Sequence, residues 1–227
     1  MVSSGYDVLK VGIFGGTFNP IHYGHLRTAE EVRLKLGFDK VLFIPSGTPP
    51  LKTKDLASAS HRFEMVRLAI LDNPFFELSD IEIRRRGKSY TVKTIEELKM
   101  SYPGLRFYLI LGIDAFLDLT NWRDPDRLAS LTDFVIISRP GFLFGDLRPS
   151  PFLKKTDYRF LREIDDAKKD SYPIVLKSGK EGLLLRTTPL GISATDIRDY
   201  IKQGESVKYL LPAEVQSFII KNKLFKN

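Results

Sequence analysis

The chain has 227 residues, which is long enough to bury a substantial core without cross-links. It contains no cysteine, and this excludes disulfides, zinc–thiolate sites, iron–sulfur clusters and a cysteine nucleophile. Lysine and arginine outnumber aspartate and glutamate by 35 to 28, and the net charge of +7 fits either a solvated basic surface or a site for an anionic partner such as nucleic acid or a phosphorylated small molecule.

Segments with strand character alternate along the chain with segments that have a helical period. Residues 8–14 are rich in β-branched and aromatic residues and predict a strand that ends at Gly15 and Gly16. Apolar residues at spacings of three and four predict a helix over 22–36, with Gly37 as its C-cap. By the same criteria, further strands are expected at 41–45, 75–83, 107–111, 134–137 and 182–187, and further helices at 62–71, 90–100, 193–202 and 212–222.

This alternation predicts an α/β fold with one doubly wound, mostly parallel sheet and helices on both of its faces. The strands are near-continuous apolar runs, as expected when both faces of a sheet are covered. No linker divides the chain, so residues 1–227 are expected to form a single domain, with 141–178 as a charged surface excursion. Ligands of such a sheet bind at the carboxyl ends of the strands.

No segment has the character of an export signal or a membrane span. The first eight residues lack a basic stretch followed by an apolar one, and apolar runs such as 107–111 are far too short to cross a bilayer. Together with the absence of cysteine, this predicts a cytoplasmic protein without a membrane partner.

The segment 12–25, with the sequence GIFGGTFNPIHYGH, lies between the first predicted strand and the first predicted helix. Gly15 and Gly16 allow a ligand to approach the backbone closely. Asn19 followed by Pro20 is typical of a helix N-cap and first helical position, where free N–H groups and the helix dipole favour an anion. The segment therefore predicts a phosphate-binding loop.

Two of the three histidines, His22 and His25, lie three residues apart in this loop and share a face of the predicted helix start. Their imidazoles can donate to phosphoryl oxygens and spread the charge of a transition state. Gly24 between them removes a side chain that would crowd phosphates, and Thr17 supplies a hydroxyl. The alternatives are a metal site, which needs more ligands, and two structural histidines that cap the loop. His61 has no motif around it and is interpreted as structural or surface-exposed.

Two common nucleotide-binding motifs are not met. The dinucleotide fingerprint G-x-G-x-x-G fails because the glycines fall at positions 12, 15 and 16. A P-loop at Gly87-Lys88-Ser89 fails because Glu82 occupies the position of its first glycine. These mismatches argue against a typical NAD-dependent dehydrogenase and against a P-loop.

A second motif, GISATDIR, occupies residues 191–198. Ser193 is a candidate N-cap with Asp196 three positions on, as in a capping box. The helix start, with Thr195 and Arg198, offers a second anion site. Taken alone, the motif favours an ordinary capped helix; paired with the first loop, it favours an anion site.

The eleven residues GGTFNPIHYGH resemble the signature of the nucleotidyltransferases that carry a (His/Thr)-x-Gly-His motif. The longer form, with Thr17, Phe18 and Pro20, is similar to that of the nicotinate-nucleotide adenylyltransferases. The sequence ISATDIR resembles the family's ISSTxIR-type motif, with Ala194 as a mild departure.

Further pieces follow the family's order between these two motifs. The loop 46–52 (SGTPPLK) resembles one that usually reads Pro-Pro-His-Lys, and Leu51 here replaces the histidine. Ser89-Tyr90-Thr91, Gly112-Ile113-Asp114, Asn121-Trp122-Arg123 and Ser138-Arg139 are similar in their order, although each has a structural alternative as a core aromatic, a helix cap or a surface residue. The resemblance covers residues 12–198, is weakest at 141–178, and implies a Rossmann-like fold.

The resemblance implies transfer of an adenylyl group from ATP to nicotinate mononucleotide, giving deamido-NAD and pyrophosphate in NAD biosynthesis, by direct displacement without a covalent intermediate. It implies Mg²⁺ carried with ATP rather than held in a protein site. The implied catalytic residues are Thr17, His22, His25 and Arg198. The implied ATP-binding residues are Gly15, Gly16, Thr17, His22, Gly24, His25, Lys52, Gly112, Asp114, Arg139, Ile192, Ser193, Thr195 and Arg198. The implied residues for nicotinate mononucleotide are Phe18, Tyr90, Thr91, Trp122 and Arg123.

Three other functions remain as alternatives. The first is an adenylyltransferase with another acceptor, such as nicotinamide mononucleotide or phosphopantetheine. The second is a nucleic-acid-binding module that uses Arg84, Arg85 and Arg86 with the nearby Tyr90, although this basic run is isolated. The third is a ligand-binding regulator without turnover, against which the intact histidine pair argues. The expected partners are therefore small molecules and not nucleic acid, and a homo-oligomer is left open.

Overall fold

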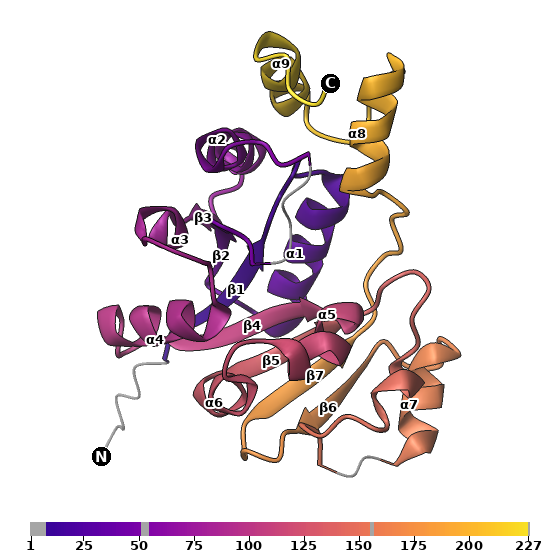
Figure 1. Cartoon of the computed structure of the whole chain (residues 1–227). Helices are drawn as coiled ribbons and strands as arrows, with labels where there is room; N and C mark the ends of the chain where they lie inside the picture. The colour runs from indigo at the N-terminus through magenta and orange to yellow at the C-terminus, as the bar shows by residue number, and fades with distance from the viewer. Residues whose placement is uncertain (1–7, 51–54, 155–156, 227) are drawn as a thin grey trace.

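A computed structural model describes residues 8–50, 55–154 and 157–226 of the chain (Figure 1). The strands are β1 (Lys10–Gly16), β2 (Lys40–Pro45), β3 (Phe76–Leu78), β4 (Arg106–Gly112), β5 (Asp133–Ile137), β6 (Ser171–Val175) and β7 (Glu181–Leu185). The helices are α1 (Tyr23–Leu36), α2 (Ala59–Ile70), α3 (Ile81–Arg84), α4 (Thr91–Ser101), α5 (Ile113–Leu117), α6 (Pro125–Leu131), α7 (Tyr158–Asp165), α8 (Ala194–Gln203) and α9 (Ala213–Lys221). Short 3₁₀ helices occupy Asp118–Asn121 and Phe144–Leu147.

The strands form one sheet in the order β3-β2-β1-β4-β5-β7-β6. Every neighbouring pair is parallel except β6, which runs antiparallel to β7 at the edge. The chain builds outward from β1 through β2 to β3, and then returns to place β4 on the other side of β1. The point at which the strand order reverses therefore lies between β1 and β4, where sheets of this type bind ligands at their carboxyl ends.

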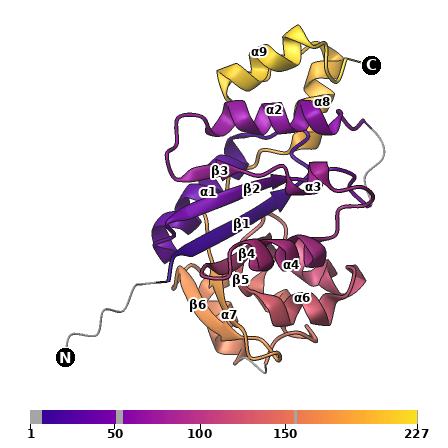
Figure 2. The same cartoon turned by 90° about the vertical axis from the view of Figure 1, so that its left-hand side faces the viewer.

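Two apolar cores cover the two faces of the sheet. Along β4, Phe107, Leu109 and Leu111 belong to the core beneath α4–α7, whereas Tyr108 and Ile110 belong to the core beneath α1, α2, α8 and α9. This alternation follows the two-residue period of a strand. Figure 2 shows α2, α8 and α9 on one side of the sheet and α4 and α6 on the other. Burial on both faces explains why the strands are apolar at nearly every position.

The predicted doubly wound, mostly parallel sheet is confirmed, and most element boundaries differ from the predictions by three residues or fewer. Gly37 is the C-cap of α1, with a left-handed φ of 60°. The expectation of an extended segment over 75–83 is wrong in its second half, because Ile81–Arg84 forms α3. Glu82 in this helix turns inward and accepts a hydrogen bond from the Thr94 hydroxyl at 2.6 Å.

The charged segment 141–178, expected at the surface, contributes to both the sheet and the core. It supplies β6, and it buries Leu147, Leu161 and Ile164 in the core beneath α4–α7. Its elements are only four to eight residues long, which is too short for a clear period in the sequence. Within the described parts of the chain, no helix has the length and apolar character needed to cross a membrane.

Candidate active site

The loop after β1 turns into α1 at His22 and not at Asn19, so the N-cap predicted at Asn19-Pro20 is wrong. His22 has extended backbone angles and precedes the first helical residue, Tyr23. The Asn19 side chain is used elsewhere: its amide group donates to the carbonyl of Asp55 at 2.7 Å, and its oxygen accepts from the Ala57 N–H at 3.0 Å. Asn19 therefore fastens the loop to the segment before α2.

The rings of His22 and His25 lie face to face at the start of α1, with centroids 3.7 Å apart and planes inclined by 34°. The backbone N–H of His22 donates to the ring atom Nδ1 of His25 at 3.3 Å. A neutral His25 therefore carries its ring proton on Nε2. His22 is only 4% exposed. Burial and the nearby positive charge of Arg139 lower the pKa of His22 to about 4, so its imidazole is neutral at pH 7.

Gly24 leaves space beside the His22 ring, on the side that faces the segment before α8. A Cβ added at this position would lie 3.0 Å from the His22 ring and 3.7 Å from the carbonyl oxygen of Ile192. The first distance is tighter than nine in ten real contacts of a Cβ atom. The same geometry shows that the first loop and the segment before α8 lie side by side, although they are far apart in the sequence.

Arg198 ties these two motifs together. Its Nη1 donates to the carbonyl of Asn19 at 2.9 Å and to that of Ala194 at 3.0 Å, and its Nη2 donates to the Thr195 hydroxyl at 3.3 Å. The predicted N-cap at Ser193 is confirmed, since its hydroxyl accepts from the Thr195 and Asp196 N–H groups. The amino end of α8 is thus fixed against the first loop.

Gly112, Asp114 and Arg139 form a second group at the carboxyl ends of β4 and β5. Arg139 Nε lies 3.5 Å from Asp114 Oδ1 at the surface of the protein. A Cβ at Gly112 would clash with Asp114 Oδ1 and would lie 3.1 Å from Arg139 Cγ. Glycine at this position therefore leaves room for the ion pair as it stands, and the positive charge of Arg139 also acts on His22.

The predicted nicotinate-mononucleotide residues are distributed between two places. Tyr90 and Trp122 both pack, partly buried, against the core beneath α4–α7, and the Arg123 guanidinium lies over the Tyr90 ring at 6.0 Å. Thr91 begins α4 directly after Tyr90. The Phe18 ring is instead buried on the other face, edge-on to His25 at 5.2 Å. Phe18 therefore supports His25 from the core, and its contact with a nucleotide stays a prediction.

Gly15, Gly16 and the loop after β2 complete the carboxyl edge near the first loop. Gly15 is exposed, and the carbonyl of Gly16 accepts from the Ser46 N–H at 2.9 Å. A Cβ at Gly16 would lie 3.0 Å from the Phe18 ring. Lys52, predicted to meet phosphate, lies outside the described residues.

Several buried polar atoms at this edge have no hydrogen-bond partner among the described residues. They are His22 Nδ1, Ser46 Oγ and Arg198 Nε. Buried polar groups are otherwise almost always paired, because an unmade hydrogen bond is costly. Their gathering on the loop after β1, the loop after β2 and α8 is what a site built for a polar ligand would leave.

Arg62 is a central residue that no sequence motif includes. Its side chain on α2 is fully buried, and its three nitrogens donate to the carbonyls of Ala57, Thr17 and Gly47 at 2.9–3.1 Å. One sequence signal points to it: Arg62 lies in the apolar stripe of α2, three and four residues before Met65 and Val66. A charge within such a stripe predicts a buried polar network.

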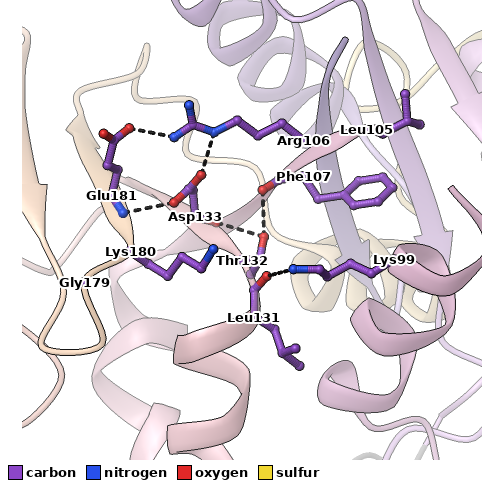
Figure 3. A pocket seen from close by; sticks show the side chains of 10 residues that line it. All are labelled: Lys99, Leu105, Arg106, Phe107, Leu131, Thr132, Asp133, Gly179, Lys180 and Glu181. Carbon is purple, nitrogen blue, oxygen red and sulfur yellow. Dashed lines mark hydrogen bonds and ion pairs between the residues drawn. The ribbon is translucent and has the colours of Figure 1, made fainter. Parts of the chain in front are cut away.

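A pocket of about 370 Å³ lies at the opposite, amino edge of the sheet (Figure 3). Arg106 at the start of β4 donates to Asp133 at 2.8 Å and to Glu181 at 2.6 Å, which raises the pKa of Arg106. Lys99 donates to the carbonyl of Leu131 at 2.7 Å. These groups join the starts of β4, β5 and β7 to one another, so the pocket is explained by the packing of the sheet.

Known proteins resemble the chain over nearly its whole length. It matches the cytidylyltransferase-like family over residues 13–200. It is 40% identical to a protein of Geotalea daltonii and 42% identical to one of Desulfitobacterium hafniense, both named "Probable nicotinate-nucleotide adenylyltransferase", with 96% of this chain and 99% and 96% of theirs covered. A solved structure of Plasmodium falciparum nicotinic acid mononucleotide adenylyltransferase complexed with NaAD has a similar fold, with a TM-score of 0.72, 20% identity and coverage of 96% of this chain and 97% of that one.

Proposed function

Because this chain belongs to the nicotinate-nucleotide adenylyltransferase family, we propose that the carboxyl edge of its sheet, between β1 and β4, is where the reaction of that family takes place. The chain is an enzyme that transfers the adenylyl group of ATP to nicotinate mononucleotide and releases deamido-NAD and pyrophosphate.

One observation supports this location above the others. Arg198 donates across 179 residues of sequence to the carbonyl of Asn19, so the GISATDIR helix start meets the loop that carries His22 and His25. Two helix amino ends, those of α1 and α8, thereby lie beside one loop. Each presents the positive end of its helix dipole to this loop, and a triphosphate needs several sources of positive potential at once.

The acceptor phosphate attacks the α-phosphorus of ATP directly. An oxygen of nicotinate mononucleotide forms the new bond to phosphorus, and the bond to the bridging oxygen of the β-phosphate breaks in line with it, so pyrophosphate leaves. No covalent enzyme intermediate is needed. The protein works by positioning both reactants and by stabilising the added charge of the transition state.

His22 and His25 would donate to the α-phosphate as this charge develops. A neutral His25 has its proton on Nε2, and a neutral His22 has a single N–H to donate. Bound phosphates favour the charged form of a nearby imidazole, so substrate binding would raise the pKa of His22 from its low value in the free protein. Thr17 would orient the acceptor phosphate.

The other polar residues would hold the two ends of the substrates. Thr195, Ser193 and Arg198 at the start of α8 would bind the leaving pyrophosphate, together with Lys52. Asp114 and Arg139 would contact the adenylate portion. On the other side, the Trp122 ring would stack on the pyridine ring, with Tyr90, Thr91 and Arg123 around it.

Mg²⁺ would accompany ATP. Among the described residues, no group of three or more His, Asp or Glu side chains is arranged to hold a metal ion. The ATP phosphate oxygens and water form the donor set that Mg²⁺ prefers, and an ion bound there neutralises charge on the pyrophosphate. The protein's part is then to hold the triphosphate at α1 and α8.

Turnover with three acceptors tests the proposal. The purified protein is incubated with ATP, Mg²⁺ and nicotinate mononucleotide, nicotinamide mononucleotide or phosphopantetheine, and pyrophosphate release is measured. We expect the highest kcat/KM with nicotinate mononucleotide. A higher kcat/KM with nicotinamide mononucleotide or phosphopantetheine would show that this compound is the preferred acceptor. The absence of turnover with all three would overturn the proposed function.

A further inference from the structure

Arg62 is a buried cation without a paired carboxylate among the described residues. Its side chain is fully buried. Among the described residues, no carboxylate oxygen lies within 4.0 Å of its guanidinium nitrogens, and the nearby Glu82 pairs with Arg85 instead. Glu82 is the acidic group that acts on it, and only from a distance. Burial lowers the pKa of Arg62 to about 10. Burying a charge without a paired carboxylate is costly. The hydrogen bonds of Arg62 must therefore compensate for this cost.

Each of the three guanidinium nitrogens donates a hydrogen bond to a backbone carbonyl, and the three carbonyls lie on separate segments. Nη1 donates to Thr17 in the loop after β1 at 2.9 Å, and Nη2 donates to Gly47 in the loop after β2 at 2.9 Å. Nε donates to Ala57, just before α2, at 3.1 Å. The planar, fork-like guanidinium fixes the directions of these bonds, which the single ammonium of a lysine does not.

The Gly47 turn is also held from its other side. The Ser89 hydroxyl accepts from the Gly47 N–H at 3.0 Å and from the Thr48 N–H at 3.3 Å, and it donates to Glu82. A Cβ at Gly47 would clash with the backbone carbonyl of Glu82, so the turn lies directly on α3. Arg62 and Ser89 thus hold the turn between them.

The opposite end of the first loop has its own tether. Arg198 holds the carbonyl of Asn19, two residues from the carbonyl that Arg62 holds. Phe18 between them has a left-handed φ of 48°, which is unfavourable for a residue with a side chain. The loop is therefore kept in one conformation by an arginine at each end.

We propose that Arg62 is a positioning residue of the adenylyl transfer: by holding the carbonyls of Thr17 and Gly47 it fixes the loop after β1 relative to the loop after β2. It touches neither substrate and acts through the Thr17 backbone, which sets the place of the hydroxyl proposed to orient the acceptor phosphate. This inference rests on the proposed function. A displacement of about 1 Å in such a group lowers turnover by about 10²-fold.

The test compares Arg62→Lys with Met65→Ala, which removes a fully buried side chain from the same helix but touches no loop carbonyl through hydrogen bonds. Melting temperature, kcat and the KM for ATP are measured for both variants and the wild type. We expect Arg62→Lys to lower kcat by about 10²-fold with the KM for ATP within about 3-fold of wild type. Met65→Ala should lower the melting temperature while its kcat, measured below the melting transition, stays near wild type.

A kcat of Arg62→Lys within about 3-fold of wild type would overturn the inference. An equal fall of kcat in Met65→Ala would overturn it as well, because loss of packing alone would then explain the effect. If Arg62→Lys does not fold, Ser89→Ala decides: it removes the other support of the same turn and should lower kcat by about 10-fold, and an unchanged kcat contradicts the inference. Failure of the proposed function is a separate result, seen as absent turnover in the wild type.

Discussion

The two edges of the sheet at which its parallel strands begin and end, the amino and the carboxyl edge, differ in how their polar groups are paired. At the amino edge, Arg106 donates to both Asp133 and Glu181, and Asp133 also accepts from the Glu181 N–H. At the carboxyl edge, His22 and Arg198 each keep a buried nitrogen without a partner among the described residues. The polar groups named at the amino edge are paired within the protein, whereas those named at the carboxyl edge retain unpaired hydrogen-bonding atoms that a ligand can satisfy.

The pKa shifts follow the same division. Hydrogen bonds to carboxylates raise the pKa of Arg106, because they stabilise its charge. Burial beside a second positive charge lowers the pKa of His22, because neither its surroundings nor Arg139 favours a proton there. One edge therefore stabilises the fold, and the other lowers stability and gains from a bound anion.

The largest effect is expected at the histidine pair. His25→Ala removes a donor from the proposed α-phosphate site, and kcat should fall on the order of 10³-fold, with the fold intact by circular dichroism. His61→Ala is the matched control, since His61 lies on α2 and its ring makes a T-shaped contact with Phe218 on α9. Pyrophosphate release measures both. A kcat of His25→Ala close to that of wild type would show that the histidine pair does not take part in the reaction.

The low pKa of His22 makes the carboxyl edge sensitive to acid. The unfolded chain takes up a proton at this histidine below pH about 6.5, but the folded protein does so only near pH 4. The free energy of unfolding should therefore fall as the pH drops through this window, by on the order of 3 kcal/mol from this group.

Urea unfolding of the wild type and of His22→Asn between pH 7 and pH 4 measures this contribution. The variant lacks the titrating group, so its stability should decline less steeply over the same range. Parallel curves for the two proteins would show that His22 has no depressed pKa in the folded state.

At the amino edge, a substitution should change stability and leave catalysis alone. Arg106→Met leaves the mostly buried carboxylate of Asp133 without its cation and should lower the free energy of unfolding by about 1–3 kcal/mol. The Arg106 side chain is 40% exposed, so solvent screens the pair and the lower part of this range is expected. Denaturant unfolding gives the stability, and kcat should equal that of wild type.

Glu181→Gln serves as the control for that substitution, because the Glu181 side chain is 69% exposed and its pair with Arg106 contributes little. A fall in kcat after Arg106→Met, measured on folded protein, would contradict the separation of the two edges.

The smallest expected effect concerns the pyridine end of the acceptor. Trp122→Ala should raise the KM for nicotinate mononucleotide by about 10-fold, through loss of stacking, and leave the KM for ATP unchanged. Trp122 is the only tryptophan in the chain, so its fluorescence reports on this site alone. Nicotinate mononucleotide should quench it and ATP should not. Equal quenching by both, or by neither, would remove Trp122 from the acceptor site.

The sequence predicts the sheet well because each strand is buried on both faces and each helix carries its own period. It also predicts the His22–Gly24–His25 turn and the Ser193 cap, since short-range chemistry decides both. It fails at Asn19, whose side chain bonds with Asp55 and Ala57, and at α3, which forms around the buried Glu82. In both places a long-range hydrogen bond overrides the local preference.

Arg62 shows the same limit within the site. No motif includes it, and the helical period of α2 does not say which partners its side chain meets. The structure buries it and gives it hydrogen-bond partners on three other segments. Such roles depend on how loops pack against one another, which no spacing within a single segment encodes.

The central claim, that the chemistry belongs to the carboxyl edge at the start of α1, can be tested without any substitution. The chain has three histidines, so the imidazole ¹⁵N and ¹H resonances of the labelled protein can be assigned to His22, His25 and His61. On saturation with deamido-NAD, we expect the resonances of His22 and His25 to shift and those of His61 to stay in place. Saturated binding that leaves His22 and His25 unchanged would contradict the claim.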